Sequence, residues 1–179
     1  MADTALTGTL VGGAISLAST LVATFGMEWI KQRRDARNLA YAFHGGISAI
    51  LAIVSERRYQ AHVAAVIAAA RVGQPISIIK IRAQRNYVEL YSKNIDRIGM
   101  LHPALAARIP TFYICVNSLL EDLDAMYNGD FDEYSPDDVL ALYIGFQDLL
   151  NKTVNLGTHI LALVAEKYPS SSFWSFLPG

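Results

Sequence analysis

Residues 5–27 read ALTGTLVGGAISLASTLVATFGM, and no side chain in this stretch carries a charge. A basic cluster follows it at once, made of Lys31, Arg33, Arg34 and Arg37. About 20 apolar residues in a helix cross the hydrocarbon core of a bilayer, so the stretch is long enough to span one. The sequence therefore predicts a membrane anchor over residues 1–30 and a helical domain over residues 31–168.

Two other interpretations of the apolar stretch compete with a spanning helix. A cleaved secretory signal carries its basic residues before the apolar run and small residues at a cleavage site after it. Here only the amino terminus and Asp3 are charged before the run, and the basic cluster comes after it. A core helix of a soluble protein is the other alternative, but the abrupt change to the sequence KQRRDAR argues against it. We therefore expect a spanning helix.

The charged flank predicts which way the anchor points. Lysine and arginine next to a membrane helix stay on the cytoplasmic side, and tryptophan is enriched at the boundary between lipid and water. Basic side chains near the surface also attract anionic lipid headgroups. We expect a bacterial-type inner-membrane protein with its N-terminus outside and the bulk of the chain cytoplasmic. The residues expected at the headgroups of the lipid bilayer are Trp29, Lys31, Arg33, Arg34 and Arg37.

Small side chains recur every four residues along the anchor. They are Gly8, Gly12, Ser16, Thr20 and Thr24. Such a stripe lets two membrane helices approach closely, and its hydroxyls can form hydrogen bonds across the interface. The pattern predicts a homo-oligomer that associates through the anchor. The alternative is that these residues pack against other helices of the same chain.

The composition restricts the classes of function. The 179 residues carry a formal net charge of -1, and their basic residues concentrate near the anchor. A nucleic-acid-binding domain carries a basic face instead, so we expect no nucleic-acid partner. The single cysteine, Cys115, excludes an internal disulfide and lies in an apolar run, as a buried small residue does.

The domain after the anchor shows helical periodicity almost throughout. Residues 28–72 contain no proline, so the anchor either continues into them as one long helix or bends at Gly45 and Gly46. Residues 76–81 look strand-like but have no partner strand, so we expect a loop or the start of the next helix. A further helix is predicted over residues 82–98, with Gly99 as its cap.

Two more helices have clear start signals. His102 and Pro103 open a helix that is expected to run to about Tyr127, with Pro110 as a kink or break. Ser135 is followed by a proline and two aspartates, which is typical of a helix start. That helix is expected to end at about Tyr168. The fold class predicted is all-α, with one N-terminal transmembrane helix followed by an antiparallel bundle of about four helices.

No residue pattern in the sequence predicts catalysis. None of the four histidines follows a Glu or Asp by three residues, as the metal-binding pairs of helical bundles do. Glycine-rich phosphate loops and nucleophile motifs are also missing from the sequence. We therefore predict no catalytic, cofactor-binding or metal-binding residues and no cofactor.

The last residues, 169–179, form an aromatic tail. Its large apolar side chains are Phe173, Trp174, Phe176 and Leu177. They are too apolar for a free terminus, so we expect them to contact the bundle, the headgroup region or a partner.

Three hypotheses about function remain open. The first is a single-pass membrane protein that self-associates through its anchor and presents its bundle to an unidentified protein partner, as a scaffold or signal relay. The second is a small oligomeric pore lined by the Ser and Thr face of the anchor. The third is a membrane-bound enzyme of unrecognised type, with a polar cleft near Arg85, Tyr87, Tyr91 and Asp96.

Overall fold

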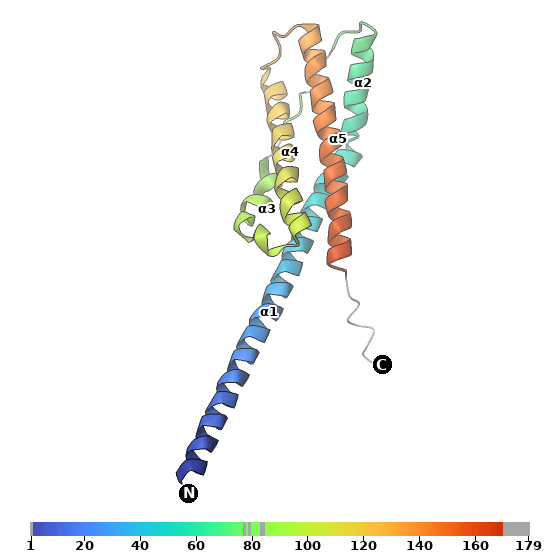
Figure 1. Ribbon diagram of the computed structural model, residues 1–179. Helices are drawn as coiled ribbons and strands as arrows, with labels where there is room; N and C mark the ends of the chain where they lie inside the picture. The colour runs from blue at the N-terminus through green and yellow to red at the C-terminus, as the bar shows by residue number, and fades with distance from the viewer. Residues whose placement is uncertain (1, 77, 79, 83–84, 170–179) are drawn as a thin grey trace. The chain divides into compact units, whose positions relative to one another are not determined.

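The computed structural model describes the backbone of residues 2–76, 78, 80–82 and 85–169, and the side chains of residues 24–76, 78, 80–82 and 86–169. Within these ranges the chain is helical and contains no strand, which confirms the all-α class (Figure 1). The α-helices are α1 (Ala2–Glu56), α2 (Tyr59–Arg71), α3 (Glu89–Ser92), α4 (Pro103–Asn128) and α5 (Pro136–Lys167). Two 3-10 helices, η1 (Arg85–Val88) and η2 (Ile95–Met100), flank α3.

The chain forms two compact units, Met1–Leu39 and Ala40–Gly179. The first unit consists of the N-terminal part of α1. The second contains the rest of α1 and all the other helices, which pack together as a bundle.

The helices α2, α4 and α5 lie side by side in the second unit, and α5 runs antiparallel to the other two (Figure 1). One buried cluster joins them: Val63 and Ile67 of α2, Leu119 and Met126 of α4, and Val139, Tyr143, Phe146 and Leu150 of α5. These positions recur at three- and four-residue spacing, so each helix turns one apolar face toward the others. A hydrogen bond of 2.8 Å between the side-chain amides of Gln60 and Asn151 also links α2 to α5.

The predicted ends of α4 and α5 are confirmed. The Nδ1 atom of His102 accepts a hydrogen bond from the backbone N–H of Ala104, at 3.3 Å, and Pro103 is the first helical residue. Gly129 ends α4 in the left-handed conformation, with a φ of 85°. The hydroxyl of Ser135 accepts a bond from the N–H of Asp138, at 3.2 Å, and caps α5.

Helix α1 continues through Gly45 and Gly46, so neither glycine ends it. A Cβ atom on Gly46 would lie 2.7 Å from Cδ2 of Leu90, so this glycine permits close packing against α3. The helix ends ten residues after Gly46, at Glu56, and Arg58 takes a left-handed conformation with a φ of 52° before α2 begins.

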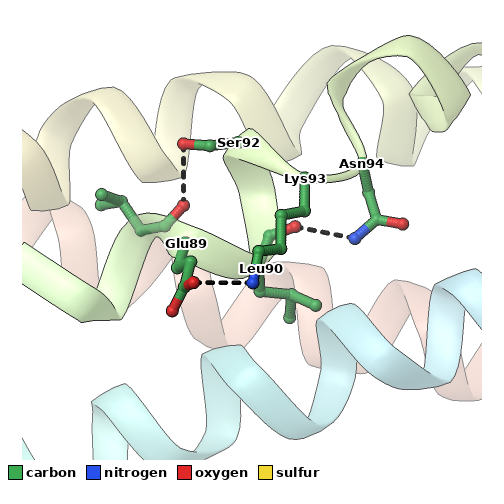
Figure 2. Close-up of polar contacts among 6 residues, drawn as sticks. Glu89, Leu90, Ser92, Lys93 and Asn94 are labelled. Carbon is green, nitrogen blue, oxygen red and sulfur yellow. Dashed lines mark hydrogen bonds and ion pairs between the residues drawn. The ribbon is translucent and has the colours of Figure 1, made fainter.

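The single helix expected over residues 82–98 is wrong, since η1, α3 and η2 share this segment. Side chains there bond to the backbone, which competes with a regular helix. Figure 2 shows the hydroxyl of Ser92 donating to the carbonyl of Val88 at 3.2 Å, and the amide of Asn94 donating to the carbonyl of Leu90 at 2.9 Å. An ion pair of 2.7 Å between Glu89 and Lys93 crosses the one turn of α3.

Candidate functional site

Most of the stripe expected to associate within the membrane lies outside the described side chains. Gly8, Gly12, Ser16 and Thr20 belong to the backbone of α1, and only Thr24 has a described side chain, which is exposed. The aromatic tail residues Phe173, Trp174, Phe176 and Leu177 lie outside the described residues altogether.

The residues expected at lipid headgroups are all exposed: Trp29, Lys31, Arg33, Arg34 and Arg37. The guanidinium carbon of Arg33 lies 3.8 Å from the centroid of the Trp29 ring, which is a cation–π contact. Phe25, Trp29, Arg33 and Arg37 follow one another at four-residue intervals, so they share a face of the helix. This face changes from apolar to basic along the chain.

One helix among the described side chains, Thr24–Glu56, is long and apolar enough to cross a membrane, with a mean hydropathy of 1.4. Its charge-poor part begins only after the basic cluster. That part includes Phe43 and Ile47, which are completely buried in the second unit. A core helix of a soluble protein has the same composition, so this finding leaves the anchor expected over residues 5–27 untested.

The second unit contains an apolar cavity of about 640 Å³. Its walls come from the end of α1, from α2, from the loop after α2, from η1, from α4 and from α5. The apolar lining residues include Ile50 and Val54 of α1, Val63 and Val66 of α2, Val116, Leu120 and Leu123 of α4, and Phe146, Leu150 and Val154 of α5. We call this space the bundle cavity.

The break between α1 and α2 helps to build the bundle cavity. Two residues, Arg57 and Arg58, separate the helices, and side chains from both sides of the break line the cavity. The first turn of α2 has no side-chain cap and no acidic residue. The N–H groups of such a turn have no partner within the helix and give it a partial positive charge.

Three charged or titratable side chains of the cavity lining are exposed to solvent. Arg57, His62 and Arg82 line the cavity and are exposed. One Nη atom of Arg57 donates to the hydroxyl of Tyr59 at 3.4 Å. The described lining contains no Asp or Glu. Thr153 is buried in the wall, but its hydroxyl donates to the carbonyl of Leu149 at 2.7 Å and is therefore satisfied.

A cluster of aromatic rings around Tyr113 forms a second notable feature of the bundle. The Tyr91 ring is stacked on the Tyr113 ring at a centroid distance of 5.0 Å, and Phe112 meets it edge-on at 5.3 Å. The hydroxyl of Tyr113 is buried and forms no hydrogen bond with the described residues. Burial of this hydroxyl raises the pKa of Tyr113 to about 12.

The cleft imagined for an enzyme is not assembled by the described residues. Tyr87 lines the bundle cavity, whereas Tyr91 stacks on Tyr113 and Asp96 is exposed on η2. The side chain of Arg85 lies outside the described set. Among the described residues, no three His, Cys, Asp or Glu side chains lie close enough together to hold a metal ion.

Sequence reasoning missed the bundle cavity because its lining is spread over six elements from Ile50 to Val154. Each helix face looks like an ordinary core face when it is considered alone. The one usable signal was the arginine pair at 57 and 58, which interrupts an apolar pattern without a Gly or Pro.

Comparison with protein-family models, with curated proteins and with solved structures found no match to this chain.

Proposed function

We propose that this chain is a single-pass, membrane-anchored protein that acts by binding, and that the bundle cavity is its ligand site. The observation that carries the proposal is the cavity of about 640 Å³. Pockets for small molecules measure about 300–1,000 Å³ and combine apolar walls with a few polar groups. The bundle cavity has this size and this composition.

The anchor part of the proposal is supported by the uncharged stretch at residues 5–27 and by the exposed side chains that follow it. Phe25 and Met27 are each 70% exposed, and Trp29 and Ile30 are also largely exposed. Large apolar side chains that remain in water cost free energy, and contact with lipid removes this cost.

The proposal also includes association between copies of the chain. The small-residue stripe from Gly8 to Thr24 would join the anchors, and the cytoplasmic bundle would be presented to a protein partner. Binding of a ligand between α1, α2, α4 and α5 would then stabilise one arrangement of the bundle, which is how a ligand changes the affinity for a partner.

The ligand site is tested with a neutral alkyl diazirine that labels protein upon illumination. The full chain is reconstituted in phosphatidylcholine nanodiscs, and the labelled peptides are identified by mass spectrometry. Ala65→Trp places a large ring at the cavity, because Ala65 lines it. Ala64→Trp is the matched control, since Ala64 is an exposed neighbour on the same helix that does not line the cavity.

We expect labelling of the cavity peptides of α4 and α5 in the native chain and in Ala64→Trp. Labelling of the same peptides should fall at least fivefold in Ala65→Trp, while labelling of the anchor stays constant. Absence of cavity labelling in the native chain, or equal labelling in both variants, would overturn the ligand site.

A further inference from the structure

We infer that the ligand of the bundle cavity is a fatty acid, with its alkyl chain between the helices and its carboxylate at Arg57, His62 and Arg82. This inference rests on the proposed function, because it names the chemical class that the proposed site would accept.

The walls suit an alkyl chain better than a flat or polar ligand. Aliphatic side chains of four helices dominate the described lining, and the one buried polar side chain, Thr153, has its hydroxyl bonded to the backbone. No buried donor or acceptor in this lining is left free to orient a polar ligand. Removal of apolar surface from water is therefore the main source of affinity there.

The volume suits one chain. A water molecule in the liquid takes up about 30 Å³, and a methylene group is of similar size. A space of about 640 Å³ therefore accommodates a single long alkyl chain. The lining also extends along the helices, from Val116 to Leu123 of α4, which corresponds to roughly 10 Å at about 1.5 Å per residue.

The positive charge of the exposed lining residues favours an anionic headgroup. Two arginines and a histidine of the lining are exposed, and the described lining contains no carboxylate to neutralise them. The ion pairs formed by the described residues are elsewhere, at Lys80–Asp132, Lys93–Glu89 and Lys167–Glu166. A guanidinium binds a carboxylate through two parallel charge-assisted hydrogen bonds, so Arg57 and Arg82 complement a fatty acid.

Arg57 is placed by the break between α1 and α2, where it could bind the carboxylate headgroup. It lies in the two-residue break before α2, next to the uncapped first turn of that helix. A guanidinium has five N–H donors, and the bond of 3.4 Å to the Tyr59 hydroxyl uses only one of those of Arg57. A carboxylate there would meet both the arginine and the positive end of the helix.

The experiment compares three diazirine probes that share a twelve-carbon chain and differ only in the headgroup. They are dodecanoate, dodecanol and a dodecyl trimethylammonium ion, each added to the full chain in phosphatidylcholine nanodiscs. Labelling of the cavity peptides is measured relative to labelling of the anchor, which corrects for partition into the bilayer. The variants are Arg57→Gln and Arg82→Gln, and Arg71→Gln serves as a control because Arg71 is exposed on α2 and does not line the cavity.

We expect dodecanoate to label the cavity most strongly and the cationic probe least. Either arginine variant should reduce dodecanoate labelling by roughly fivefold, as loss of a partly exposed charged contact does, and leave dodecanol labelling within twofold. Arg71→Gln should leave all three probes unchanged. Circular dichroism of each variant checks that the bundle remains folded.

The outcomes separate this inference from the function on which it rests. Equal labelling by all three probes, blocked by Ala65→Trp, would overturn the fatty acid and keep the apolar site. Loss of dodecanoate and dodecanol labelling together in Arg57→Gln and Arg82→Gln would also contradict a role for these arginines in headgroup selection. Absence of cavity labelling by every probe would overturn both proposals.

Discussion

Tyr113 shows how a single residue can be well packed and poorly satisfied at once. Its side chain is 2% exposed and contacts Phe43, Tyr91 and Phe112 through its ring. Its hydroxyl finds no hydrogen-bond partner among the described residues. A buried polar group without a partner costs about 1–3 kcal/mol. The ring contacts of Tyr113 therefore stabilise the folded bundle, whereas its buried hydroxyl destabilises it.

Tyr113→Phe should accordingly stabilise the bundle by about 1 kcal/mol, because it removes the hydroxyl and keeps the ring contacts. The measurement is the free energy of unfolding in urea, followed by circular dichroism on the solubilised full chain. Tyr91→Phe is the control, since it removes a hydroxyl from a half-buried ring of the same stack and should change stability little. A loss of stability in Tyr113→Phe would show that its hydroxyl has a partner after all.

The raised pKa of Tyr113 predicts a dependence on alkaline pH. In the unfolded chain the hydroxyl loses its proton at about pH 10, whereas burial in the folded state raises its pKa to about 12. The unfolded state therefore binds fewer protons between these values, and the free energy of unfolding falls as pH rises from 10 to 12. We expect a loss of roughly 2 kcal/mol over this window, at about 1.4 kcal/mol per unit. The same titration of Tyr113→Phe should lack this component, and identical curves would contradict the assignment to Tyr113.

At the scale of the elements, two glycines of α5 show how closely this helix packs against its neighbours. A Cβ on Gly157 would lie 2.8 Å from Cε2 of Phe112 and 3.1 Å from Cδ2 of Leu51. A Cβ on Gly145 would meet no atom within 4 Å. Both glycines lie inside the same helix, so the two positions differ in their surroundings rather than in their helix propensity.

Gly157→Ala should therefore destabilise the bundle by about 1–2 kcal/mol, because the added methyl would push the Phe112 ring and the Leu51 side chain of α1 away from α5. Gly145→Ala should instead stabilise it by about 0.5–1 kcal/mol, since alanine is the better helix former. The midpoint of thermal unfolding, measured for both variants and the native chain, shows whether their stabilities change in opposite directions. Equal effects of the same sign would contradict close packing at Gly157.

The elements that could be predicted from the sequence are those with local signals. His102, Gly129 and Ser135 fix the ends of α4 and α5 through contacts within a few residues of each end. The packing role of Gly46 had no such signal, since this glycine admits Leu90 from a distant part of the chain. The break at Arg58 has only a weak local signal, the arginine pair in an apolar pattern, because a left-handed arginine is rare and neither Gly nor Pro marks the end of the helix. The bundle cavity was beyond sequence reasoning for a similar reason, as it exists only when six elements meet.

The proposed membrane anchor leads to a prediction at the same scale. Gly12→Leu should weaken association of the full chain, because the leucine side chain separates two helices that approach at the stripe. Val11→Leu is the matched control, since it adds one methylene at the neighbouring position off the stripe. Oligomer size in detergent, measured by native mass spectrometry, reports the effect. An unchanged oligomer in Gly12→Leu would count against association through this face.

At the scale of the whole molecule, the two units have different surfaces. The unit Ala40–Gly179 buries most of its large apolar side chains, such as Phe43, Phe112 and Tyr143. The unit Met1–Leu39 exposes Phe25 and Met27 to 70%. The same helix carries the basic cluster, so under the proposed anchor Phe25 and Met27 would contact lipid rather than water.

The basic cluster therefore predicts the orientation of the whole chain. Its arginines and lysine should keep the bundle cytoplasmic, so a C-terminal tag should resist protease in intact spheroplasts and be digested after lysis. Replacement of Lys31, Arg33, Arg34 and Arg37 by Gln removes the charge asymmetry, and a fraction of the tags should then become accessible in intact cells. Replacement of Arg57, Arg58, Arg71 and Arg82 by Gln removes the same number of charges far from the anchor in sequence and should leave the tag protected. Protection that is identical in both variants would overturn the role of the cluster in orientation, and a chain recovered in the soluble fraction would overturn the anchor itself.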